Sequence, residues 1–90
     1  MNEEDGKIKM EFIYSETCPD CPPAKEAVER IKADHDELDV EYIKAKDRAD
    51  IIQKYDITHV PTIVINENVE FVETLTEEKL RNRLEEIRNG

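Results

Sequence analysis

The sequence predicts an α/β fold in which a four-stranded mixed sheet has helices on both faces. Two observations lead to this prediction. Segments with strand-like and helix-like patterns follow one another in the order β-α-β-α-β-β-α, and 90 residues suit one compact domain but not two. We therefore expect a single domain over residues 1–90, with a polar segment at residues 1–6 that frays from it.

The first half of the chain has the pattern of a parallel β-α-β unit. Residues 7–14 (KIKMEFIY) end in an apolar run typical of a central strand. Residues 19 to about 36 are predicted to form an amphipathic helix, with an apolar stripe made of Ala24, Ala27, Val28 and Ile31. Residues 39–44 (DVEYIK) alternate like a second strand. A connection of this length makes the two strands parallel and the crossover right-handed.

The second half predicts a short helix, a hairpin and a last helix. Residues 47–55 suit a helix with three inward side chains, Ile51, Ile52 and Tyr55. Residues 62–65 and 69–72 suit antiparallel strands joined by the polar turn 66–68. Thr76 is the predicted N-cap of the last helix, Leu75 and Leu80 suit a hydrophobic staple, and the apolar stripe consists of Leu80, Leu84 and Ile87.

The charge of the chain limits its partners. With 23 acidic and 13 basic residues the net charge is −10, which disfavours nucleic acid and anionic membranes as partners. Residues 1–5 are acidic and lack the pattern of a signal peptide, and no segment approaches the ~20 apolar residues of a membrane span. We expect a cytoplasmic monomer whose partners are neutral or basic near the contact.

The segment Cys18-Pro19-Asp20-Cys21 is the candidate site. Two thiols at this spacing can close into one disulfide, and the amides of a helix start favour the thiolate of Cys18. We expect Cys18 to attack a disulfide and Cys21, deeper in the turn, to resolve the mixed disulfide. In a reducing compartment such a pair is more typical of catalysis or metal binding than of a structural disulfide. The alternatives are an idle Cys pair and a metal-binding site, for which His35 and His59 lack suitable spacing.

We expect charged side chains near the cysteine pair to affect the ionisation of Cys18. Glu16 and Asp20 lie close in sequence to Cys18, so their carboxylates oppose its ionisation and favour a reductant over an oxidant. The alternative is that both carboxylates point into water and are screened. His59 is a further candidate modulator because histidine titrates near neutral pH, the alternative being a solvated loop residue.

Three stretches together resemble the thioredoxin superfamily, in particular small, glutaredoxin-sized thioredoxins of archaeal type with a Cys-Pro-x-Cys site. They are residues 18–25, residues 55–65, which contain Val60-Pro61-Thr62, and residues 69–72. The resemblance spans residues 7–88. It implies a minimal thioredoxin fold and a thiol–disulfide oxidoreductase that reduces protein disulfides, needs no bound cofactor or metal, and is recharged by an electron donor of the thioredoxin reductase type.

The resemblance also implies a substrate cleft. Pro61 is expected to be cis and to face the dithiol, and the backbone N–H and C=O of Val60 are expected to be free to pair with an extended substrate. Pro19 and Asp20 are expected to contact the substrate from the other side.

The chain departs from these families at three points. Thr17 stands where thioredoxins have an aromatic residue, and Phe12 where they have a buried aspartate, so proton transfer to and from Cys21 needs water or another group. Glu73-Thr74 replaces the Gly-Gly pair of glutaredoxins, and the Glu73 carboxylate would repel glutathione. Two alternative functions follow: a glutathione-dependent glutaredoxin, which Glu73 disfavours, and a non-catalytic module that binds a metal or a partner through the same two cysteines.

Overall fold

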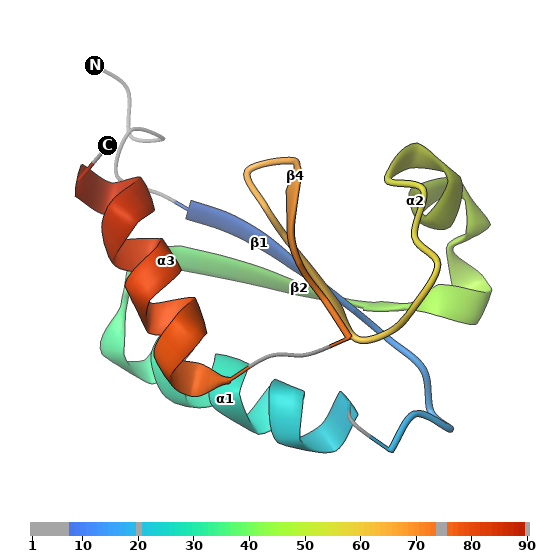
Figure 1. The fold of residues 1–90 in the computed structure, drawn as a ribbon, viewed down its shortest axis with the longest axis horizontal. Helices are drawn as coiled ribbons and strands as arrows, with labels where there is room; N and C mark the ends of the chain where they lie inside the picture. The colour runs from blue at the N-terminus through green and yellow to red at the C-terminus, as the bar shows by residue number, and fades with distance from the viewer. Residues whose placement is uncertain (1–7, 20, 74–75, 90) are drawn as a thin grey trace.

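The computed structural model describes residues 8–19, 21–73 and 76–89 (Figure 1). Its elements, in chain order, are β1 (Ile8–Tyr14), α1 (Cys21–Asp34), β2 (Leu38–Lys44), the 3₁₀ helix η2 (Ala45–Asp47), α2 (Ala49–Lys54), β3 (Thr62–Ile65), β4 (Asn68–Val72) and α3 (Glu77–Asn89). This is the predicted order of strands and α-helices, with the 3₁₀ turn added.

The four strands form one mixed sheet in the order β2-β1-β3-β4. β2 runs parallel to β1 and β3 runs antiparallel to β4, as predicted, and β3 also pairs antiparallel with β1. Ile13 lies beside Ile43 on one side and Thr62 on the other. The end of β1, which leads to Cys18, therefore meets the start of β3, which follows Pro61.

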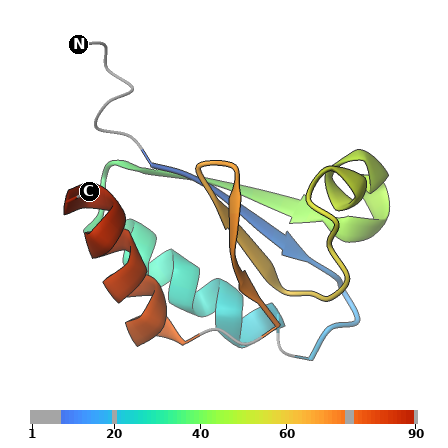
Figure 2. The same ribbon diagram turned by 45° about the horizontal axis from the view of Figure 1, so that its top comes forward.

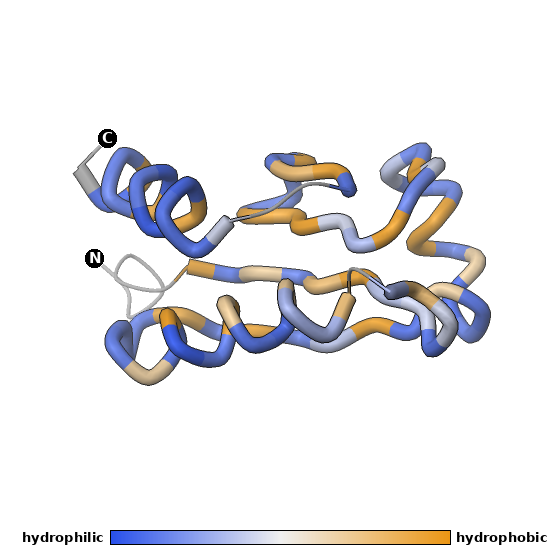
Figure 3. The backbone as a smooth tube through the Cα atoms, turned by 60° about the horizontal axis from the view of Figure 1, so that its bottom comes forward, coloured by the Kyte–Doolittle hydropathy of each residue, from blue (hydrophilic) through white to orange (hydrophobic). Residues whose placement is uncertain are grey.

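Helices cover both faces of this sheet, which confirms the predicted fold class. Figures 1 and 2 show α1 and α3 side by side, on the other side of the sheet from α2. The core between the sheet and α1 and α3 includes Phe12, Val28, Ile31, Leu80 and Leu84. The smaller core on the α2 side consists of Ile13, Ile43, Ile51 and Val64. Figure 3 shows hydrophobic residues recurring among hydrophilic ones along α1 and α3, as expected for helices with one face against a sheet.

The start of α1 differs from the prediction. The helix begins at Cys21, whereas the sequence pattern suggested Pro19. A helix that began at Pro19 would need an N–H at residue 23 for its first internal hydrogen bond, and proline has none. Starting at Cys21 keeps Pro22 and Pro23 in the first turn, where the missing donors cost no helical bond.

Two other expectations concern helix ends and inward side chains. Thr76 is the N-cap of α3, because its Oγ1 accepts a hydrogen bond from the Lys79 amide at 3.2 Å. On the α2 side Ile51 is buried, and Ile52 and Tyr55 are partly buried and pack against the same core, so all three side chains point inward as predicted. Leu75 and residues 1–6 lie outside the described residues. Within the described ranges, none of the helices has the length and apolar character needed to cross a membrane.

Candidate active site

The loop before the first cysteine is held by short polar contacts. The Thr17 amide donates to Ser15 Oγ at 3.3 Å, the two side-chain hydroxyls lie 3.1 Å apart, and the Cys18 amide donates to the Ser15 carbonyl at 3.3 Å. These bonds turn the chain sharply after β1 and present Cys18 at the carboxyl end of the strand, where functional groups of α/β sheets gather.

The two cysteines occupy different environments. Cys18 is half-buried, whereas Cys21, the first residue of α1, is 4% exposed. Both are thiols in this structure. The amide of Cys21 donates to the Cys18 carbonyl at 3.4 Å, which closes the turn into the helix. Asp20, which we expected to oppose ionisation of Cys18 and to contact the substrate, lies outside the described residues. Of the two sulfurs, that of Cys18 is the more accessible to a large substrate.

The Val60-Pro61 peptide bond is cis, as the resemblance implied. The loop around it is held from two sides: Thr62 Oγ1 donates to the His59 carbonyl at 2.6 Å, and the Glu73 amide donates to the Pro61 carbonyl at 2.8 Å. Pro61 and Thr62 are buried, whereas Val60 stays partly exposed.

Val60 meets the first cysteine directly. The Cys18 thiol donates to the Val60 carbonyl with a sulfur-to-oxygen distance of 3.6 Å. The expectation that both backbone groups of Val60 are free was therefore wrong for the carbonyl in the reduced protein. Its N–H has no hydrogen-bond partner among the described residues. The structure thus brings Cys18, Val60 and Pro61 together, as the sequence suggested.

Glu16 is turned toward two lysines. Its carboxylate lies 3.2 Å from Lys44 Nζ and 3.7 Å from Lys46 Nζ. The hydrogen bond from Lys44, its charge and that of Lys46 lower the pKa of Glu16, and Glu16 in turn raises the pKa of Lys44. Both lysines compensate the charge of Glu16, which weakens its expected opposition to the Cys18 thiolate.

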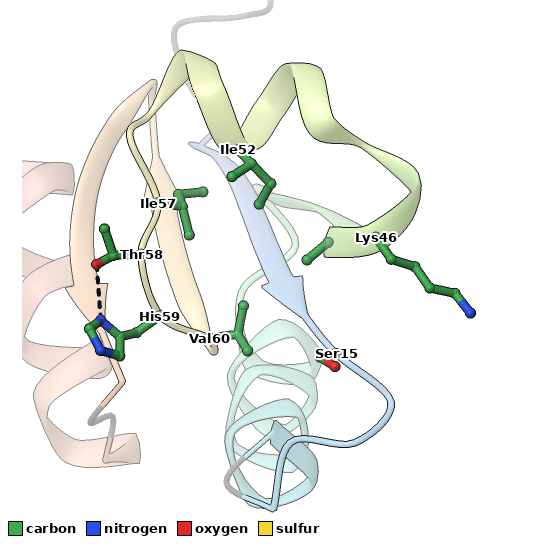
Figure 4. A pocket seen from close by; sticks show the side chains of 8 residues that line it. Ser15, Lys46, Ile52, Ile57, Thr58, His59 and Val60 are labelled. Atoms are coloured by element: carbon green, nitrogen blue, oxygen red, sulfur yellow. Dashed lines mark hydrogen bonds between the residues drawn. The ribbon is translucent and has the colours of Figure 1, made fainter.

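A groove of about 360 Å³ opens beside Val60 on the α2 side of the site (Figure 4). Apolar side chains and a polar rim line it, namely Ser15, Ala45, Lys46, Ile52, Ile57, Thr58, His59 and Val60. His59 is exposed, and its Nδ1 lies 2.9 Å from Thr58 Oγ1. Of these residues only Val60 and His59 were predicted. Ile52 and Ile57 have the same apolar character as core residues, so the sequence pattern alone does not distinguish a groove from a core.

The buried acid of this sheet lies one residue from the position expected for the family. Glu11 is 4% exposed and its Oε1 accepts a hydrogen bond from the Tyr55 hydroxyl at 2.9 Å, on the α2 side of the sheet. Because successive strand residues face opposite sides, Phe12 instead packs on the side of α1, the helix that begins with Cys21. Glu11 is therefore not positioned to exchange a proton with Cys21.

Metal-ligand clusters are absent from residues 8–19, 21–73 and 76–89, which contain no group of three or more His, Cys, Asp and Glu arranged to hold an ion. Of the two histidines, His35 instead pairs with Glu37 at 3.2 Å and lies at the end of the molecule where β2 begins, while His59 lies in the groove.

Comparison with known proteins agrees with this geometry. Residues 7–85 match the family model described as "Thioredoxin domain". The chain is 43% identical over 76 residues to a thioredoxin of Methanocaldococcus jannaschii, covering 83% of this chain and 89% of the relative. It is 40% identical over 75 residues to a probable thioredoxin of Methanothermobacter thermautotrophicus, covering 81% and 87%.

The fold has solved counterparts as well. A thioredoxin from Trypanosoma brucei brucei superposes with a TM-score of 0.80 at 17% identity, covering 94% of this chain and 78% of that one. At this identity the likeness concerns the fold alone. The matched family and the archaeal relatives identify a thiol–disulfide oxidoreductase. On its sequence, its fold and the position of its two cysteines, the chain belongs to the thioredoxin family.

Proposed function

We propose that this protein reduces disulfide bonds in other proteins, with Cys18 as the nucleophile and Cys21 as the resolving thiol. The observation that supports this most directly is the contact between the half-buried Cys18 sulfur and the Val60 carbonyl, 3.6 Å away, while Cys21 is 4% exposed. A protein substrate can reach the first sulfur but not the second.

The first step forms a mixed disulfide. The Cys18 thiolate attacks one sulfur of the substrate disulfide and bonds to it, and the electron pair of the broken S–S bond leaves with the other substrate sulfur, which takes up a proton. Cys18 no longer has a thiol proton at this stage. The Val60 carbonyl then loses its donor and is available, with the Val60 N–H, to pair with an extended substrate chain. Pro19, which is exposed, and Asp20 would contact the substrate from the α1 side.

The second step releases the substrate. Cys21 gives up its proton to water and its thiolate attacks the Cys18 sulfur, which closes the Cys18–Cys21 disulfide and frees the second substrate thiol. Two electrons have moved from the protein to the substrate. The cysteine pair holds them itself, so no bound cofactor is needed, and a reductase of the thioredoxin reductase type would restore the dithiol. A pair that must be kept reduced favours a cytoplasmic location. We expect the protein to act there as a monomer.

Reduction of insulin by the purified protein, with dithiothreitol as the electron donor, tests the proposal. We expect Cys18→Ser to abolish reduction. Cys21→Ser should stop turnover but still accumulate a mixed disulfide with insulin at Cys18, visible by mass spectrometry, because only the resolving step is lost. Alkylation of the reduced protein with limiting reagent should label Cys18 first. Labelling of Cys21 first would show that the roles are reversed.

A further inference from the structure

Glu73 combines an unusual backbone conformation with a position at the site. It follows β4 with a φ of 71°, in the left-handed region that favours glycine, and its side chain is exposed. Its amide donates to the Pro61 carbonyl at 2.8 Å. This bond attaches Glu73 to the loop that faces Cys18.

The backbone of Glu73 lies close enough to the Cys18 sulfur for the charge of this residue to act on charged substrates. Pro61 is bonded to Val60, whose carbonyl is 3.6 Å from the Cys18 sulfur, and the Glu73 amide is 2.8 Å from the Pro61 carbonyl. Two contacts and one proline residue therefore separate Glu73 from the reacting atom, a span on the order of 10 Å. Charges at such a separation still interact at low ionic strength, where the screening length is about 30 Å.

Among the described residues, the charge of Glu73 has no cationic partner. Across the part of the chain that the structure describes, no cation forms a salt bridge with Glu73, whereas Glu16 on the α2 side is bound by Lys44 and Lys46. A strained residue persists only when the structure around it imposes it, and such residues gather at functional sites. Glutamate has no steric advantage at this φ. The property that distinguishes it from glycine at this position is therefore its charge.

From these contacts we infer that Glu73 is a specificity residue that slows reaction with anionic disulfides, such as that of glutathione, and speeds reaction with disulfides flanked by cationic groups. The inference rests on the proposed thiol–disulfide exchange and adds the charge of its preferred substrates. Glu73 acts through its field on the approaching substrate and takes no part in breaking or forming bonds.

The test uses three small disulfides that differ in charge: the anionic disulfide of glutathione, cationic cystamine and neutral bis(2-hydroxyethyl) disulfide. Each oxidises the reduced protein to the Cys18–Cys21 disulfide and is itself converted into two thiols. The chain contains no tryptophan whose fluorescence could report the disulfide. The reaction is therefore quenched with an alkylating reagent, and the mass of the protein is measured by mass spectrometry. For each variant, the rate measured with each charged disulfide is divided by the rate measured with the neutral disulfide.

Three substitutions separate charge from conformation. Glu73→Gln removes the charge and keeps the side-chain shape, and Glu73→Lys reverses the charge. Glu67→Gln is the matched control, because Glu67 is also exposed with a positive φ of 68° but lies in the β3–β4 turn, at the opposite end of the hairpin from Pro61.

A unit charge about 10 Å away in water changes a rate roughly twofold, in opposite directions for the two charged disulfides. Glu73→Gln should therefore raise the ratio of the glutathione-disulfide rate to the cystamine rate about fourfold at about 0.01 M salt. Glu73→Lys should raise it about 16-fold, and both effects should vanish at about 1 M salt, where the screening length is roughly 3 Å. Glu67→Gln should change the ratio less than about twofold.

An unchanged ratio in Glu73→Gln and Glu73→Lys, with the neutral disulfide still oxidising the pair, would overturn the inference and leave the proposed function intact. The same ratio change in Glu67→Gln would also overturn it, because the effect would then come from net charge. If no disulfide oxidised the cysteine pair of the unaltered protein, the proposed function would fail, and the role of Glu73 with it.

Discussion

The start of α1 gives the two cysteine side chains, Cys18 and Cys21, different exposures. Cys21 is the first residue of α1 and is 4% exposed, while Cys18 stands three residues earlier, half-buried and in contact with the Val60 carbonyl. The difference arises because the chain turns inward once the helix begins. A buried thiol is protected from outside reagents and can still meet a sulfur on the preceding turn.

Asp20 should set the reduction potential of the cysteine pair. A carboxylate between two cysteines disfavours the thiolate, so Asp20→His, which allows a positive charge there, should stabilise the reduced form and make the couple more oxidising. A shift of about 30 mV corresponds to roughly 1.4 kcal/mol for a two-electron couple. Equilibration with glutathione buffers measures the potential. Asp20→Asn separates loss of the negative charge from gain of the positive one, and an unchanged or more negative potential for Asp20→His would contradict the electrostatic argument.

Glu73 should also limit stability. A non-glycine residue in the left-handed region costs roughly 1–2 kcal/mol, and glycine loses about 0.5–1 kcal/mol more chain entropy on folding. Glu73→Gly should therefore stabilise the protein by about 0.5–1 kcal/mol, measured by urea unfolding. Glu73→Ala keeps the β carbon and should gain nothing. Equal stabilisation by Ala and Gly would show that the carboxylate, and not the backbone angle, is the source of the cost.

At the scale of elements, β3 and the loop before it form the side of the site that contacts Cys18. β3 is buried along its whole length between β1 and β4, so its first residue, Thr62, is held firmly. Thr62 has no exposed surface, and its hydroxyl donates to the His59 carbonyl at 2.6 Å. The strand thereby positions the loop residues that contact Cys18.

Thr62→Val should weaken the attachment of the loop before β3 while keeping the shape of the side chain. The substitution removes one side-chain hydrogen bond, so we expect a loss of about 1 kcal/mol in the free energy of unfolding and weaker reduction of insulin. Thr62→Ser keeps the hydroxyl and should retain most of the activity. Urea midpoints and insulin reduction measure the two effects. If Thr62→Val equals the unaltered protein in both, the hydroxyl does not hold the loop.

At the scale of the whole molecule, the two faces of the sheet differ in polarity. The core on the α1 and α3 face consists of hydrophobic side chains, whereas the α2 face encloses the hydrogen bond between Tyr55 and the buried Glu11 carboxylate. Burial, this bond and the charges of Glu11 and Glu67 raise the pKa of Tyr55 to about 12. Ionised Tyr55 would face these carboxylates, so the folded state favours the neutral phenol.

This linkage predicts how stability falls in alkali. The unfolded protein loses the Tyr55 proton near pH 10, before the folded protein does, so the contribution is complete below about pH 10 and is lost as the pH rises toward about 12. Tyr55→Phe cannot ionise and should lose less stability between these values. Urea unfolding at a series of pH values compares the two proteins, with each normalised to its own stability at neutral pH. Parallel curves would mean that Tyr55 does not contribute.

Much of this organisation could be predicted from the sequence. The apolar run before Cys18, the helical stripe after it and the turn-rich hairpin gave the order of the elements along the chain, the parallel pair β1–β2 and the antiparallel pair β3–β4, because these patterns depend on local periodicity and connection length. The start of α1 was missed by two residues, since apolar periodicity says little about the first turn and Pro22 and Pro23 decide it. The groove beside Val60 was missed because Ile52 and Ile57 have the composition of a core.

The sequence by itself determined the fold class, through the patterns of residue types along the chain, and its resemblance to the thioredoxin superfamily singled out the Cys18–Cys21 pair and the cis Pro61. Only the tertiary structure decided which groups touch. It placed the Val60 carbonyl on the Cys18 thiol, turned Glu16 toward Lys44 and Lys46, and joined Glu73 to Pro61. These contacts link segments far apart in sequence, and their geometry follows from how the strands align and where the chain bends between them, which local patterns do not specify.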